Sequence, residues 1–463
     1  MILTYVIAYL LSYLLATFHL YIASGVVLMA EAIVLYAHEY RRTGHILNLS
    51  GLYSLSLVGG EGISCLKLSY IQTDWEPMTW ICFFLAYIGF RAGISTCREG
   101  EECRIFKKAG DAVSCVKNFL MRRSFSDKRL LIMNCCLAAA SWLAFTAEAV
   151  LLGYIPFFVR GVPHAYSEFH ISGVHYFTVS AVLCPSFSLI WYMIKKKSAG
   201  SSKAPKLYEK AAALAAALSG FVIPVLCVSR FQFVFALMLA VFIWIVIYEH
   251  KNRISTKNLI RLGCGCALVL VPAYIVLTIA RSHDAEYLKG IFEMKKDYPI
   301  VFSHFYIYIA NNFDNFDCMV KNLTTHTFGV RQLFPLLALT GLKFVFPQLV
   351  TSEYFITKKE LGTLTLFYDA YYDFGVAGVL AFTVLLGMAG SFLERSVFRG
   401  RDAGALMLYG QFAIYMALAF FTTWFSNPTT WFYIGVTIVV YMLSLKKDAA
   451  AGVVGTEKSI DDQ

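Results

Sequence analysis

Long stretches without a charged residue recur along the whole chain, and they constrain its fold more than any other feature. Each is about 17 to 25 residues long, the length that a helix needs to cross a bilayer. Charged residues make up 15% of the 463 residues, whereas a soluble domain carries about 25%. Because a helix satisfies its backbone hydrogen bonds internally, it can lie in lipid. The sequence therefore predicts an all-α, polytopic integral membrane protein.

The apolar runs predict about twelve transmembrane helices. The first run has no small-residue cleavage site after a short apolar core, so we expect a retained helix and not a signal peptide. The predicted spans are 2–18, 20–37, 51–70, 77–93, 130–155, 173–194, 208–228, 231–248, 263–280, 374–393, 404–425 and 430–445.

Lysine and arginine predict the orientation. If both termini are cytoplasmic, the cytoplasmic segments hold most of the 40 lysines and arginines, as the positive-inside rule requires. These segments include a basic loop, 91–129, and a polar tail, 446–463. The net charge of +10 then reflects orientation and contact with anionic lipid. It gives no argument for nucleic acid as a partner.

One large extracytoplasmic loop, 281–373, is predicted between spans 9 and 10. Such a length is unusual for a simple connector. Its segment "VFSHFYIYIANNFDNFDCMVKN" (301–322) has helix-like apolar spacing, and "FPLLALTGLKFVFP" (334–347) is apolar and contains proline near each end. We expect amphipathic helices that lie on or dip into the outer membrane face.

A ring-rich polar patch ends this loop. The stretch "GTLTLFYDAYYDFGVAG" (362–378) places Asp369 and Asp373 one helical turn apart, with Tyr368 and Tyr372 beside them. Rings can stack on sugars and carboxylates can accept hydrogen bonds from sugar hydroxyls. A belt of interfacial tyrosines is the alternative, but it does not explain two aspartates on one helix face.

Four stretches, in this order along the chain, resemble the bacterial oligosaccharide repeat-unit polymerases. This family includes the O-antigen, capsular and exopolysaccharide polymerases. The fourth stretch leads back into the membrane through an Asp-Phe-Gly step. The stretches are "GEGISCLKLS" (60–69), "GYIPFFVRGVPHAYSEFHISGVHYF" (153–177), "VLCVSRFQFVFALMLAVF" (225–242) and "TLTLFYDAYYDFGVAGVLAFTVLLG" (363–387).

The resemblance implies a GT-C-like membrane fold and glycosyl transfer at the outer face of the bacterial plasma membrane. The implied donor is a glycan on undecaprenyl pyrophosphate, and the acceptor is one lipid-linked repeat unit. A chain-length-determining membrane protein is an implied partner. Because the leaving group carries its own activation, no cofactor is expected. No carboxylate pair with metal-ligand spacing occurs in the extracytoplasmic segments, so we also predict that the reaction needs no metal.

Arginine suits the departing pyrophosphate, because its planar fork pairs with phosphate oxygens and stays protonated. The leading candidate is Arg230, which stands in a minimal turn between two spans. A structural ion pair is the alternative for Arg230, and an interfacial anchor or a solvated charge is the alternative for the others. The predicted pyrophosphate-binding residues are Arg230, Arg281, Arg160 and Arg331.

A general base would take the proton of the acceptor hydroxyl. His326 is the first candidate, because histidine titrates near neutral pH. Asp369 and Asp373 are the alternatives. The predicted sugar-binding residues are Tyr368, Tyr372 and His170, with His164 and His175 as neighbours of similar chemistry.

Four ionisable residues lie in or near the spans. Intramembrane charges are candidates for function by default, but here we expect internal pairing that holds helices together. These residues are Glu31, Glu61, Lys67 and Glu148.

Other functions share this architecture. A ligase that moves a finished glycan to another acceptor would have the same spans and outer loop. A lipid-linked oligosaccharide flippase, which is a transporter, would also have about twelve spans, although transporters usually contain two similar halves. An assembly scaffold is a third alternative.

Overall fold

The computed structural model describes residues 2–96, 126–159, 165–198, 205–249, 256–280, 285–350, 353–398 and 403–445. Within these ranges the chain is helical, apart from loops and one isolated bridge between Ser69 and Met294. The predicted basic loop 91–129 lies largely outside the described residues, and the tail 446–463 lies wholly outside them.

Helices occupy every predicted span. Seven helical segments are long and apolar enough to cross a membrane, namely α2, α4, α7, α11, α12, α18 and Val174–Lys196. Among the described residues the all-helical class is thus confirmed, and these long apolar helices fit a polytopic membrane protein. The count of twelve spans and the GT-C-like fold stay predictions. The helices at the predicted spans are α1 (Ile2–Thr17), α2 (Tyr21–Thr43), α3 (Leu49–Ser64), α4 (Pro77–Thr96), α7 (Asp127–Leu152), α9 (Val174–Ser180) with α10 (Cys184–Ser198), α11 (Leu207–Leu226), α12 (Arg230–Glu249), α13 (Thr256–Ala280), α18 (Tyr368–Phe398), α19 (Ala403–Ala417) and α20 (Pro428–Ser444).

Two predicted spans were too long at their C-terminal ends. The third stops at Ser64 and not near residue 70, because Lys67 adopts a left-handed backbone conformation (φ 48°) that a helix cannot continue. The eleventh stops at Ala417, and the loop that follows contains a short 3₁₀ helix, η4 (Trp424–Ser426). Both loops contact the large segment 285–373, as described below.

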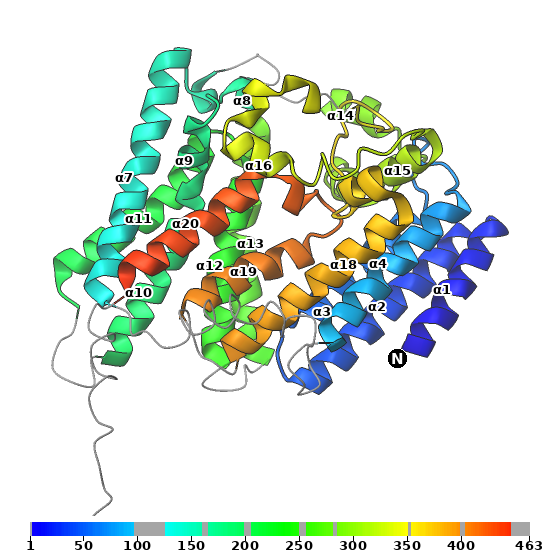
Figure 1. Ribbon diagram of the computed structural model, residues 1–463, viewed down its shortest axis with the longest axis horizontal. Coiled ribbons are helices and arrows are strands. Elements are labelled where there is room, and N and C mark those ends of the chain that lie inside the picture. Colours follow the sequence, from blue (N-terminus) through cyan, green and yellow to red (C-terminus); the bar gives the residue numbers. More distant parts are fainter. Residues whose placement is uncertain are drawn as a thin grey trace, which may run out of the picture.

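The helices form two groups that share a middle layer (Figure 1). Helices α1 to α4 and α18 lie side by side, with α4 against α18 and α2 against α3. Helices α7, α9, α10, α11 and α20 form the second group. Helices α12 and α19 pack against each other between the groups. The buried apolar residues form one main cluster that runs through all of these helices.

The large segment between α13 and α18 gathers at one end of the bundle, here called the loop end (Figure 1). Its elements are α14 (Ala285–Phe292), α15 (Ile300–Asn322), α16 (Phe334–Leu339), α17 (Leu342–Val345) and the 3₁₀ helix η3 (Pro347–Leu349). The starts of α4, α12 and α18 lie at the same end, since successive long helices alternate in direction. Residues far apart in sequence therefore meet there.

The segment 301–322, predicted to lie on or dip into the outer membrane face, forms a helix, α15, whose C-terminal two-thirds are largely buried. Helix α15 is buried on several sides, with Ala310, Phe313 and Phe316 fully enclosed. Its polar residues Asn312 and Asp314 are also buried, at 0% and 2% exposure. Sequence spacing suggested an amphipathic surface helix, but the polar face is covered by other loops that supply hydrogen-bonding partners.

The second apolar loop stretch is exposed. It forms α16 and α17, which are separated by Gly341 in the left-handed conformation (φ 77°). Leu336, Phe344 and Val345 are 58%, 69% and 65% exposed. An exposed apolar surface of this kind suits contact with lipid, so the expected membrane contact of this stretch remains a prediction.

Candidate functional site

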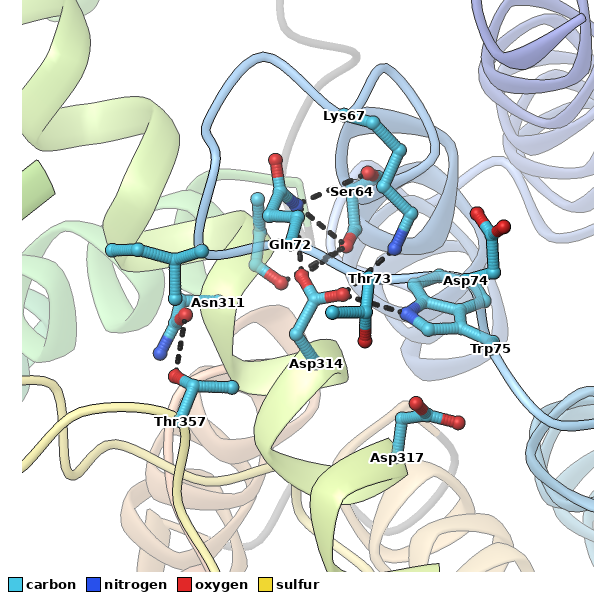
Figure 2. Close-up of polar contacts among 12 residues, drawn as sticks. Ser64, Lys67, Gln72, Thr73, Asp74, Trp75, Asn311, Asp314, Asp317 and Thr357 are labelled. Carbon is cyan, nitrogen blue, oxygen red and sulfur yellow. Dashed lines mark hydrogen bonds and ion pairs between the residues drawn. The ribbon is translucent and has the colours of Figure 1, made fainter. Parts of the chain in front are cut away.

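A buried polar network around Asp314 fixes the position of α15 (Figure 2). The Asp314 carboxylate pairs with Lys67 Nζ at 2.7 Å. It also accepts hydrogen bonds from Gln72 Nε2 and Trp75 Nε1, both at 2.8 Å, and from Ser64 Oγ at 3.2 Å. A carboxylate has about four acceptor sites, so all the hydrogen-bond acceptor sites of Asp314 are occupied. We therefore assign this network a structural role.

The network extends to Tyr306 on the same helix. Its hydroxyl donates to Gln72 Oε1 at 2.6 Å and accepts from the Leu68 backbone N–H at 2.9 Å. Burial raises the pKa of Tyr306, so the hydroxyl stays protonated and remains a donor. These hydrogen bonds hold the loop 65–76 against α15. They therefore also define where the segment that follows α15 begins.

Arg331, in the segment after α15, is the centre of the candidate site. Its side chain is 4% exposed, and its Nε donates to Asp369 Oδ1 at 2.9 Å. The guanidinium carbon lies 4.0 Å from the ring centre of Tyr372, 4.5 Å from that of Tyr354 and 5.9 Å from that of Tyr368. These five residues are called the Arg331 cage. Ring faces attract the cation and exclude water from it.

Two donors at the cage lack partners within the described residues. Arg331 Nη2 and Gln332 Nε2 are buried, and neither makes a hydrogen bond there. The Arg331 Nη1 group reaches only the Glu353 carbonyl, at 3.4 Å. Buried polar groups are nearly always satisfied, so such exceptions need an explanation. A guanidinium with a free N–H is suited to an anionic oxygen.

Asp369 is held from a second side. The Thr423 and Ser426 side chains lie beside it, and both belong to the loop between α19 and α20. Asp369 therefore aligns Arg331 and links it to this loop. Nothing in the sequence marks either hydroxyl residue, because they lie more than 50 positions from Asp369 in the chain.

Asp373 anchors the loop that carries Arg331. Its carboxylate accepts from Gln332 N at 2.9 Å, from Arg331 N at 3.2 Å and from the Thr327 hydroxyl. The side chain is fully buried. With its oxygens occupied, Asp373 is a positioning residue in this structure, whereas the sequence had offered it as a base.

His326 lies at the edge of the same group and is exposed. Its Nδ1 is 3.1 Å from the Tyr372 carbonyl oxygen. Helix α18 is kinked beside it, since Phe374 and Gly375 leave the helical conformation. A Cβ on Gly375 would lie 3.2 Å from His326 Nε2, and Gly375 has φ 62°, so only glycine fits comfortably. The kink brings His326 against the start of α18.

The predicted sugar-binding tyrosines are packed inside. The Tyr368 hydroxyl donates to the Phe355 carbonyl and accepts from the Phe355 N–H, both at 3.0 Å. The Tyr372 ring is 7% exposed and lies between Arg331 and Phe355. Tyr354 is 58% exposed and also faces Arg331. It is the cage ring available to a ligand, and the sequence analysis did not single it out.

The other predicted arginines are not in the cage. Arg230 begins α12 at the loop end and is half-buried. Its neighbour Phe231 packs on Trp424, with ring centres 5.3 Å apart, so α12 begins beside the loop that holds Asp369. Arg160 and Arg281, like His164, lie outside the described residues.

His170 belongs to another cluster at the loop end. Its Nδ1 is 3.2 Å from the Ser167 carbonyl, and its ring lies edge-on to His175. Glu148 pairs with His175 at 3.1 Å and accepts from Ile171 N at 2.9 Å. The structure brings these residues together without placing them in the Arg331 cage.

The expected internal pairing of intramembrane charges is confirmed for two residues. Lys67 pairs with Asp314, and Glu148 pairs with His175. Glu61 is different. It is fully buried, and neither carboxylate oxygen has a hydrogen-bonding partner among the described residues.

Searches of protein-family models, of curated proteins and of solved structures found no significant match to this chain. Among the described residues, no group of three or more His, Cys, Asp or Glu side chains could hold a metal ion. Function is therefore inferred from the chemistry of the cage and its surroundings.

Proposed function

We propose that this chain is a membrane glycosyltransferase that joins polyprenyl-pyrophosphate-linked oligosaccharide repeat units at the outer face of the bacterial plasma membrane. The products are O-antigen, capsular or exopolysaccharide chains, as the sequence resemblance implies. The loop end then faces outward and both termini face the cytoplasm, in agreement with the positive-inside rule.

The observation that carries this proposal is the buried guanidinium of Arg331, whose Nη2 donor has no partner among the described residues. In the reaction, an acceptor hydroxyl attacks the anomeric carbon of the donor sugar. The bond between that carbon and the phosphate oxygen breaks, and polyprenyl pyrophosphate leaves with the electron pair. Arg331 would stabilise the charge that builds on the leaving phosphate, and the low-dielectric cage would strengthen this effect.

The surrounding groups fit the same reaction. Tyr354 offers an exposed ring face to a sugar next to Arg331. Asp369 keeps the guanidinium oriented. His326 is exposed at the edge of the cage and would take the proton of the acceptor hydroxyl. Asp373 would support the reaction indirectly, through the loop that carries Arg331.

The test uses the purified full chain in liposomes, with lipid-linked repeat units supplied on the loop-end side only. We expect a ladder of longer glycans. Arg331→Lys keeps the charge but loses the planar fork, so it should reduce elongation at least about 100-fold, the scale of losing one transition-state donor. Arg41→Lys, at an exposed arginine on α2, is the matched control and should elongate normally.

The outcomes separate the alternatives. Transfer of a finished chain to a different acceptor, without elongation, would identify a ligase. Movement of the lipid-linked unit across the bilayer, without any new glycosidic bond, would identify a flippase. Normal elongation by Arg331→Lys would remove Arg331 from the mechanism.

A further inference from the structure

Glu61 on α3 is the most deeply buried acid that the proposed reaction leaves unexplained. Its side chain is 0% exposed, and within the described residues its carboxylate oxygens accept no well-formed hydrogen bond, although the Tyr9 side chain lies beside them. Removing a charged carboxylate from water costs several kcal/mol even after relaxation, unless it is paired. An ionised Glu61 in this environment would therefore be strongly unfavourable.

Tyrosines surround this carboxyl group. Tyr5 and Tyr9 of α1 and Tyr53 of α3 interact with it electrostatically. The Tyr5 hydroxyl is itself buried without a partner, as is the hydroxyl of Tyr87 on α4, whose ring centre lies 4.4 Å from that of Tyr5. Several unsatisfied polar atoms thus lie together between α1, α3 and α4.

No described cation neutralises Glu61. Lys67 follows it on the chain but is paired with Asp314 at 2.7 Å. Arg91 of α4 is paired with Glu39 of α2 at 2.7 Å. The remaining titratable neighbours are Cys65, which is buried, and Glu31 of α2, which is another acid.

Helix packing closes the side towards α2. A Cβ on Gly62 would lie 2.8 Å from the Gly25 carbonyl oxygen, and one on Gly25 would lie 2.5 Å from the Gly62 carbonyl oxygen. Such a close crossing leaves no space for water next to Glu61 on that side. The carboxyl group therefore faces the tyrosines.

A route to solvent begins at the loop end. A cavity of about 250 Å³ is lined by residues that include Tyr13, Cys65, Lys67, Trp80 and Asp74. Asp74 is 64% exposed, so the cavity rim is open to solvent. Two features bring the cavity close to Glu61. Cys65 lies one helical turn after Glu61, and the Tyr9 hydroxyl donates to the Trp80 carbonyl at 2.7 Å.

We propose that Glu61 is a proton-binding site within the helix bundle, and that it exchanges its proton with water in this cavity through the Tyr9 hydroxyl. Tyr9 lies beside Glu61, and its own hydroxyl proton is held by the Trp80 carbonyl, so in the protonated form the Glu61 O–H would donate to the free lone pair of the Tyr9 oxygen. Release transfers that proton to Tyr9, while the Tyr9 hydroxyl proton leaves the Trp80 carbonyl for water in the cavity that Trp80 lines, so one proton leaves and Glu61 becomes a carboxylate. This site is independent of the glycosyltransferase proposal.

Infrared spectroscopy of the full chain in liposomes at neutral pH tests the site. We expect a C=O band of a protonated carboxylic acid that shifts when H₂O is replaced by D₂O. The band should be lost in Glu61→Gln, which replaces the neutral acid with an amide of the same shape. It should persist in Glu39→Gln, the matched control, because Glu39 is equally buried but is paired with Arg91 and Arg42. A wild-type band in Glu61→Gln would overturn the proposal.

The exchange route has its own test, which needs no substitution of Glu61. Tyr9→Phe should keep the acid band but slow its D₂O shift several-fold. Tyr53→Phe, which removes another buried hydroxyl beside Glu61, should exchange at the wild-type rate. Equal exchange rates in Tyr9→Phe and wild type would exclude Tyr9 from the route.

Discussion

Arg331 Nε lies 2.9 Å from Asp369 Oδ1, and both side chains are less than one-tenth exposed. This contact joins the long segment after α15 to the start of α18. Because Thr423 and Ser426 also lie beside Asp369, three separate parts of the chain meet at one ion pair. The ion pair is thus the centre of the proposed site, and it also stabilises the packing of the loop end.

The Arg331–Asp369 pair predicts a measurable stability effect. Arg331→Met leaves Asp369 buried without its cation, and breaking a buried pair costs about 3–5 kcal/mol. The double variant Arg331→Met with Asp369→Leu should lose less, because no uncompensated charge remains. Thermal unfolding in detergent would check both. A single variant as stable as the wild type would contradict the observed pairing.

Trp75 is expected to stabilise the loop end through one hydrogen bond. Its Nε1 donates to the Asp314 carboxylate at 2.8 Å. Trp75→Phe should cost about 1.5–3 kcal/mol of unfolding free energy, the usual range for a hydrogen bond to a charged group. Trp431→Phe is the control, since Trp431 is exposed and donates to the neutral Phe425 carbonyl. The Trp431→Phe change should cost about 0.5–1.5 kcal/mol of unfolding free energy. A larger cost for Trp431→Phe than for Trp75→Phe would refute the role given to the Trp75 hydrogen bond.

Gly375 should not tolerate a side chain. It has φ 62°, and a Cβ would crowd His326 Nε2 at 3.2 Å. Gly375→Ala should destabilise the protein by about 1–3 kcal/mol, the cost of a strained backbone position. Gly435→Ala is the matched control, because Gly435 lies inside α20 with open space around it. That change should be neutral or slightly stabilising.

The exposed apolar surface of α16 and α17 is expected to contact the membrane. A spin label on Phe344→Cys should collide more often with oxygen, which concentrates in lipid, than with a water-soluble nickel complex. Phe344 is 69% exposed, next to Val345 at 65%. The same label on Thr325→Cys, in an exposed loop, should show the opposite preference. Equal preference for the nickel complex at both sites would exclude lipid contact of α17.

Cys318 on α15 should react slowly with maleimide at neutral pH. Burial raises the pKa of its thiol, so less of it is the reactive thiolate than in a free cysteine. Because the pKa of Cys318 is raised, its rate of reaction with maleimide should keep increasing with pH. The rate of a cysteine placed at Thr325 should level off at a lower pH. Peptide mass spectrometry can follow both residues. A rate at Cys318 that levels off first would contradict this prediction.

The sequence located helices better than it located contacts. Uncharged runs predicted helix at every span, because the bilayer imposes a length and a lack of charge on each segment. Helix ends were less certain, as α3 and α19 show, because those ends depend on loops that fold back from elsewhere. For α15, the same apolar spacing fits a surface helix and a buried one, and only the partners of Asp314 decide between them.

The candidate site was predicted in part. Arg331, Asp369, Tyr368 and Tyr372 were singled out from the sequence, and they do lie together. Tyr368 and Asp373, predicted to bind sugar and to act as a base, use their polar atoms to hold neighbouring segments. Tyr354, Thr423 and Ser426 gave no signal in the sequence, because nothing near them in the chain marks them as close to Arg331.

The sequence by itself determined the class of this protein, because apolar segments of bilayer length with few charges satisfy their backbone groups in lipid by forming helices. It also determined which residue types were available for chemistry at the long loop. Only the tertiary structure decided which charges are neutralised and which are left without a partner. Distances of a few ångströms between segments decide whether a polar atom finds a partner. Asp314 has hydrogen-bonding partners, whereas Arg331 Nη2 and the Glu61 oxygens have none among the described residues.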